Sequence, residues 1–138
     1  MKFKVFSKIR FFFLIYSVMI FSACHDSDKI EPEYGERTVL IYMAADNDLN
    51  KDGETNIESI LKGMEQTAGR LVIYIDPRYD VPRLLTVKGG KGCRLDTLET
   101  YTEENSASPE VLARVVKEVQ KRYPASSYGL VLWSHGLG

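Results

Sequence analysis

Three runs of mostly apolar, β-forming residues limit the fold of this chain more than any other feature: residues 38–44, 70–75 and 128–133. None of them alternates polar with apolar positions, so each predicts a strand that is buried on both faces. Strands of this kind belong to parallel sheets, whose crossover connections cover the faces with helices. The 138 residues allow one domain at most, so the runs predict an α/β domain with a mostly parallel sheet.

The segments between these runs have the patterns of two helices and a hairpin. Residues 53–69 predict a helix, and its apolar face consists of Ile57, Ile60, Leu61 and Met64. A second helix is expected to begin at the capping residue Ser108, which is followed by Pro109. Residues 81–87 and 93–98 flank a glycine-rich turn and predict a small hairpin. Right-handed crossovers then place the helices on the faces of the sheet.

The amino-terminal residues have the composition of an export signal. Residues 1–23 have four basic residues within the first ten positions and continue with an uncharged, mostly apolar run of 13 residues, which is short for a permanent membrane span. Residues 21–24 resemble the lipobox of bacterial lipoproteins, in which the cysteine becomes the lipidated first residue after cleavage. Residues 24–36 are polar and acidic, and they predict a tether with little to bury.

These features predict an exported protein that is lipid-anchored to a bacterial membrane at Cys24, in the periplasm or at the cell surface. Ordinary secretion with an unmodified Cys24 is the alternative. Without residues 1–23 the chain has 14 Lys and Arg against 19 Asp and Glu, a formal charge of −5, which argues against nucleic acid as a partner. The two histidines and two cysteines are far apart in the sequence, so no metal site is predicted.

The run at residues 128–133 leads directly into Ser134, His135 and Gly136. Because α/β proteins build their sites at the carboxyl ends of parallel strands, His135 is expected at the site. Histidine exchanges protons near neutral pH and can act as a general base, while the backbone N–H of Gly136 can bind an oxyanion. A capping or solvated histidine in an ordinary turn is the alternative.

Two segments together resemble the clostripain-like cysteine peptidases, a family with a caspase-like fold. Residues 38–49 resemble the family's first strand and its following loop, and residues 123–136 resemble the strand that leads to its catalytic histidine. The resemblance implies that residues 37–138 are the amino-terminal part of a peptidase domain. The expected fold is therefore α/β and caspase-like but incomplete, with about three core strands, a small hairpin and two helices.

The family cuts peptide bonds, mostly after Arg or Lys, with a Cys–His dyad. The resemblance makes His135 the dyad histidine and places Gly136 at the oxyanion site. The family's nucleophilic cysteine follows its histidine by some tens of residues, so it is expected beyond Gly138. The chain alone is therefore expected to be inactive and to need a carboxy-terminal half. Asp46, Asn47 and Asp48 are expected at the same sheet edge as His135, where they could line the cleft or bind a cation. Asp46 and Asn47 are the candidates for binding the peptide or protein substrate, and an ordinary role in the turn is the alternative.

The residues require no cofactor, and calcium, which the family can use, has no support in this sequence. Ser134 and Leu137 depart from the family's pattern, which usually has Asp and a small residue at these positions. Cys93 precedes the histidine, which is the wrong order for the family, and it is expected to be an ordinary hairpin residue.

Two other classes of function follow from the same residues. A lipid-anchored binding module without catalysis, or a decayed remnant with the same fold, is the second interpretation. A flavodoxin-like nucleotide binder is disfavoured, because neither residues 45–48 nor residues 134–138 have the spacing of a phosphate loop. The third run is expected to leave an open apolar edge, so residues 37–138 alone are predicted to be poorly stable. A cooperative thermal transition of that segment as a monomer would contradict this prediction.

Overall fold

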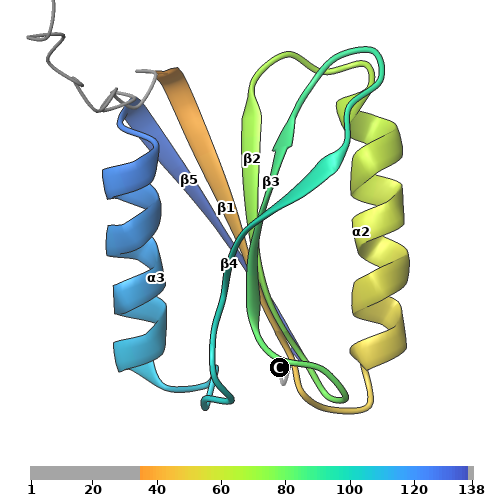
Figure 1. Cartoon of the computed structure of the whole chain (residues 1–138), viewed down its shortest axis with the longest axis vertical. Coiled ribbons are helices and arrows are strands. Elements are labelled where there is room, and N and C mark those ends of the chain that lie inside the picture. The colour runs from red at the N-terminus through yellow and green to blue at the C-terminus, as the bar shows by residue number, and fades with distance from the viewer. Residues whose placement is uncertain (1–34, 137–138) are drawn as a thin grey trace, which may run out of the picture. The chain divides into compact units, whose positions relative to one another are not determined.

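The computed structural model describes residues 35–136, which form a five-stranded mixed sheet with two helices (Figure 1). The sheet has the order β4-β3-β2-β1-β5. The predicted signal at 1–23, Cys24 and most of the predicted tether at 24–36 lie outside the described residues. In chain order, the elements are β1 (Gly35–Ala45), α2 (Asn50–Met64), β2 (Arg70–Pro77), β3 (Arg83–Lys88), β4 (Leu95–Thr100), α3 (Pro109–Arg122) and β5 (Ala125–Trp133).

The three predicted apolar strands form the parallel centre of the sheet. β1 pairs in parallel with β2 on one side and with β5 on the other, so that Met43 lies opposite both Ile75 and Trp133. The predicted hairpin extends the same sheet, because β3 pairs antiparallel with β2 and β4 pairs antiparallel with β3. The predicted α/β architecture is therefore confirmed, and the hairpin makes the sheet mixed.

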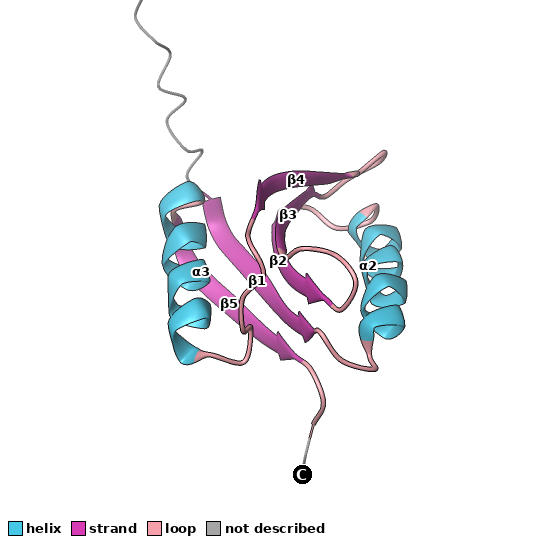
Figure 2. Cartoon of the chain, turned by 60° about the horizontal axis from the view of Figure 1, so that its bottom comes forward, coloured by secondary structure: helices cyan, strands magenta, loops and turns pink. Residues whose placement is uncertain are grey.

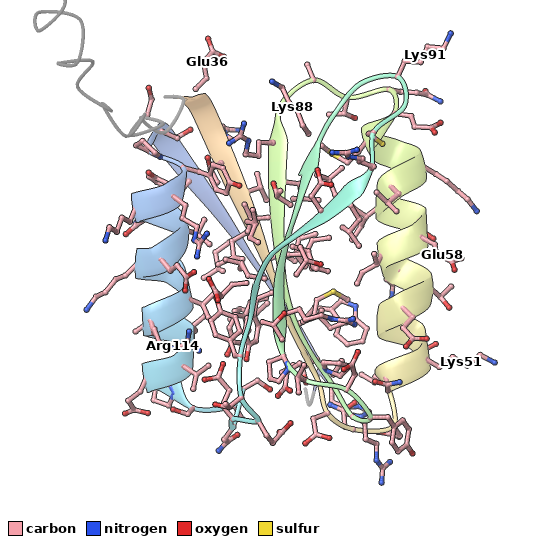
Figure 3. The ribbon with its side chains drawn as sticks, viewed as in Figure 1. Glu36, Lys51, Glu58, Lys88, Lys91 and Arg114 are labelled. Atoms are coloured by element: carbon pink, nitrogen blue, oxygen red, sulfur yellow. The ribbon has the colours of Figure 1, made fainter. Side chains whose placement is uncertain are left out.

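One helix covers each face of the sheet, as Figure 2 shows. Successive strand residues point to opposite faces, so a strand with apolar residues throughout fills two cores. The core under α3 consists of Leu40, Tyr42, Val72, Tyr74, Leu84, Val115 and Val119. The core under α2 contains Met43, Ile73 and Ile75, packed against Ile57, Ile60 and Met64 of the helix. Figure 3 shows Lys51 and Glu58 pointing away from the sheet on the outer side of α2.

The start of α3 follows the sequence prediction. The Ser108 side chain accepts hydrogen bonds from the backbone N–H groups of Glu110 and Val111, and Pro109 occupies the first helical position. This capping satisfies donors that have no partner inside the helix. α2 was predicted over residues 53–69, whereas in the structure it begins at Asn50 and ends at Met64.

β5 is an edge strand with exposed apolar side chains. Leu130 and Leu132 on the α3 face are 49% and 65% exposed, and Val131 on the other face is 46% exposed. Within residues 35–136 no strand pairs with the outer edge of β5. The open apolar edge that the sequence predicts is therefore present in the described part of the chain. Of the helices in residues 35–136, none is both long and apolar enough to cross a bilayer.

Candidate active site

Two loops meet at the carboxyl edge of the parallel strands. β1 and β5 are parallel neighbours, so residues 46–49 after β1 and residues 134–136 after β5 emerge side by side. Figure 2 shows β1 and β5 ending at the same edge of the sheet. The sheet topology thus brings together the two loops that the sequence predicts at the site.

His135 lies at this edge and contacts one side chain of the neighbouring loop. Its Nε2 is 2.6 Å from Oδ1 of Asp48, and the two side chains are 48% and 79% exposed. A carboxylate accepts hydrogen bonds and does not donate them, so Nε2–H of the imidazole is the donor. The hydrogen bond from His135, together with a backbone N–H, holds the pKa of Asp48 below its ordinary value.

A single carbonyl group ties the two loops together. The backbone oxygen of Ala44 accepts hydrogen bonds from the Ser134 hydroxyl at 3.1 Å and from Nδ2 of Asn47 at 3.0 Å. The Asn47 side-chain oxygen accepts the backbone N–H of Leu49 at 2.8 Å, which shapes the start of α2. Ser134, which departs from the family pattern, therefore has a defined structural contact in this chain.

The structure places the other predicted site residues at the same edge. Asp46 and Gly136 are exposed there, while both polar groups of the Asn47 amide bond within the loop. Substrate binding by Asp46 and Asn47, and oxyanion binding by Gly136, stay predictions.

Asp76 is a carboxyl group at this edge that the sequence interpretation did not single out. It is the residue before the last of β2, lies opposite Ala44 of β1, and is 1% exposed. Its Oδ1 has no hydrogen-bond partner. Burial raises its pKa, against the lowering effect of hydrogen bonds from Ser106, and the nearby Asp46 and Glu104 raise it further. The feature of the sequence that could have indicated Asp76 is its position directly after the apolar run at residues 70–75.

A small cavity adjoins the site, on the α3 side of the sheet. Its volume is about 320 Å³, and its lining includes Tyr42, Ala44, Ser106, Pro109, Leu132 and Ser134. The loop before α3 is fixed here, because the Tyr42 hydroxyl donates to the Ser106 carbonyl at 2.9 Å. Burial also raises the pKa of Tyr42 to about 12, so this hydroxyl stays a donor at neutral pH.

A larger cavity of about 760 Å³ lies at the opposite end of the strands, lined by Gly35, Met64, Gly69, Lys88 and others. Figure 3 shows Glu36 and Lys88 at this end. Cys93 also lies away from His135, and its thiol contacts the carbonyl oxygen of Leu61 at 3.2 Å near the end of α2. Within residues 35–136, no cluster of three or more His, Cys, Asp or Glu is arranged to hold a metal ion.

Comparison with known proteins identifies the family and the fold. A family model described as the Clostripain family matches residues 41–138. A Bacteroides fragilis cysteine protease is 40% identical with a TM-score of 0.70, over 75% of this chain and 92% of that chain. An inactive zymogen protease from Parabacteroides distasonis is 46% identical with a TM-score of 0.72, over 78% of this chain and 32% of that chain.

A secreted cysteine protease from Bacteroides thetaiotaomicron, solved with an irreversible peptide inhibitor, is 34% identical with a TM-score of 0.69. That match covers 75% of this chain and 30% of the other, so the chain spans about a third of the length of two of these relatives. A search of curated proteins gives no significant match.

The fold is thus the caspase-like fold of cysteine proteases, with a histidine at the carboxyl edge of its parallel strands. The chain belongs to the clostripain family.

Proposed function

We propose that this chain supplies the histidine-bearing part of a cysteine endopeptidase that cuts after Arg or Lys. The observation that carries the proposal is the position of His135, which follows β5 at the carboxyl edge of a clostripain-family fold. In this proposal the imidazole takes the proton of a cysteine thiol, and the thiolate attacks the peptide carbonyl. The backbone N–H of Gly136 stabilises the resulting oxyanion.

The remaining steps of the proposed reaction use the same histidine and cysteine. The tetrahedral intermediate collapses to a thioester when the imidazolium gives its proton to the leaving amine. Water then attacks the thioester, His135 takes the proton of that water, and the cysteine leaves as the thiolate. A histidine that is exposed and open at one side suits both steps, since peptide and water must reach it.

The nucleophile is proposed to come from polypeptide outside residues 1–138. Cys93 lies near the end of α2 and away from His135, and the other cysteine is Cys24 in the predicted lipobox. A further strand paired with the outer edge of β5 would end at the same edge as His135 if it runs parallel. The exposed Leu130, Val131 and Leu132 support this position, because such a strand and its covering helices would bury them.

The experiment uses the full-length protein that contains this chain, with peptidyl irreversible inhibitors that end in Arg, Lys or a neutral residue. We expect covalent labelling by the Arg and Lys probes, and peptide mapping should locate the adduct on a cysteine after residue 138. Cys93→Ser, the matched control, should label as the wild type does. An adduct on Cys93 would contradict the proposed nucleophile. Reversible peptide binding without any adduct would contradict the peptidase proposal and favour the non-catalytic binding module.

We also propose that the protein is exported and lipid-anchored through Cys24. The basic start, the short apolar run and the lipobox resemblance support this, and the similar protease from Bacteroides thetaiotaomicron is a secreted protein. A fatty-acid analogue fed to expressing cells should label the wild type and not Cys24→Ser; equal labelling of both would exclude lipidation at this residue.

A further inference from the structure

The loop after β1 brings a carboxylate to the histidine after β5. Asp48 and His135 are 87 positions apart in the sequence, and their side chains meet at 2.6 Å. The meeting depends on the parallel register of β1 and β5, which sends both segments to one edge. It also depends on the fixed loop backbone, in which the Asn47 side chain accepts the Leu49 N–H and the Gly53 N–H bonds to the Leu49 carbonyl.

This contact contributes little to the stability of the fold. Asp48 is 79% exposed and His135 is 48% exposed, and ion pairs between exposed side chains are weak because water and salt screen the charges. The loops are already held together by the hydrogen bonds of Ser134 and Asn47 to the Ala44 carbonyl. The two loops therefore do not need the Asp48–His135 contact to stay together.

We propose that Asp48 is the positioning residue of His135, a role that rests on the proposed peptidase function. By accepting the Nε2–H, Asp48 fixes the plane of the ring and leaves Nδ1 as the nitrogen that faces the thiol. The carboxylate also stabilises the imidazolium that forms when the thiol loses its proton. The lowered pKa of Asp48 is consistent with this role, because the carboxylate stays ionised throughout the neutral pH range.

The kinetic test uses the full-length protein with Asp48→Ala and Asp48→Asn. We expect kcat to fall about tenfold to a hundredfold in Asp48→Ala with KM unchanged, because misplacing a reacting group has effects of this size. Asp48→Asn keeps an acceptor oxygen without the charge, so its loss of kcat should be smaller. Asp52→Asn, an exposed carboxyl in the first turn of α2, is the control that removes the same charge.

A spectroscopic test does not depend on catalysis. Carbon-13 NMR of the Asp48 carboxyl should show a higher pKa in His135→Ala than in the wild type, because the hydrogen bond that lowers it is gone. The thermal midpoints of the Asp48 variants should stay close to that of the wild type. An unchanged Asp48 pKa, or a kcat of Asp48→Ala equal to that of Asp52→Asn, would overturn the inference.

The two proposals fail in different ways. If His135→Ala is inactive while Asp48→Ala is fully active, His135 keeps its role and the positioning role of Asp48 is wrong. If His135→Ala keeps wild-type activity, the proposed function itself is wrong.

Discussion

At the scale of single residues, Asp76 combines full burial with incomplete hydrogen bonding. It is 1% exposed, Ser106 donates to it, and its Oδ1 has no partner. Burial raises its pKa in the folded state, and Asp46 and Glu104 act in the same direction. The folded state therefore binds this proton more tightly than the unfolded state does. The stability that this carboxyl contributes is fully present below about pH 4, its unfolded pKa, and is lost as pH rises through the folded value.

Asp76→Asn should therefore be more stable than the wild type at pH 7, because the amide cannot ionise. We expect a gain in unfolding free energy on the order of 1 kcal/mol, the scale of an unsatisfied buried polar group. The gain should shrink as pH falls through the raised pKa of Asp76 in the folded state, because the wild-type carboxyl is then protonated. Denaturant unfolding between pH 4 and pH 7 measures this, with Asp52→Asn as the charge-matched control. A variant less stable than the wild type at pH 7 would show that the carboxylate stabilises the fold.

Some site residues were predictable from the sequence and others were not. Ser108 and Pro109 predict a helix start, because serine caps helices and proline favours the first helical position. An apolar strand that leads into His135 predicts a histidine at the sheet edge. The sequence placed Asp48 at the same edge, but its contact with His135 was not predictable, because it depends on the register of two strands. The same holds for the burial of Asp76, which is set by the loop before α3.

At the scale of elements, the limits of α2 show how packing overrides local signals. The sequence predicts that this helix begins at Gly53, yet α2 begins at Asn50 and buries Gly53 in its first turn. A Cβ at this position would lie 3.5 Å from the Cβ of Ala45 and 3.6 Å from both Ile75 and Trp133. The glycine thus lets the helix approach the sheet closely. Gly69, at φ +113°, leads into β2 and lies five residues after the helix ends at Met64.

The hairpin turn packs against the segment that follows α2, and Gly89 is the point of closest approach. A Cβ there would overlap the carbonyl oxygen of Thr67 and crowd Met64, while the Gly89 N–H donates to the Gly69 carbonyl at 2.8 Å. Gly89→Ala should lower the unfolding free energy by about 1–3 kcal/mol, because backbone atoms must move apart.

Gly63→Ala is the matched control for this prediction. It lies in α2 with nothing within 4 Å of the added Cβ, so it should raise the unfolding free energy by about 1 kcal/mol through helix propensity. Chemical denaturation of both variants measures the two effects. Equal stability of Gly89→Ala and the wild type would mean that the turn does not pack on this segment in solution.

At the scale of the whole molecule, the sheet order brings the site together and leaves one strand open. β1 lies between β2 and β5, and all three strands are parallel. Asp48 in the loop after β1, Asp76 near the end of β2 and His135 after β5 therefore lie at the same carboxyl edge of the sheet. The sequence predicted the parallel centre, because the three strands are apolar on both faces. It did not predict that the hairpin continues the sheet beside β2, since the short strands β3 and β4 are compatible with a separate ribbon. The exposed apolar residues of β5 are where we propose that the nucleophile-bearing polypeptide joins.

The central claim is that His135 is the general base of a cysteine peptidase. The most direct measurement is kcat/KM of the full-length protein on peptides cut after Arg or Lys, for the wild type, His135→Ala and His25→Ala. His25 is the other histidine of the sequence and gives a control with the same substitution. We predict that His135→Ala loses at least about a hundredfold in kcat/KM, the range of general acid–base catalysis, and that His25→Ala does not. Undiminished cleavage by His135→Ala would contradict the account.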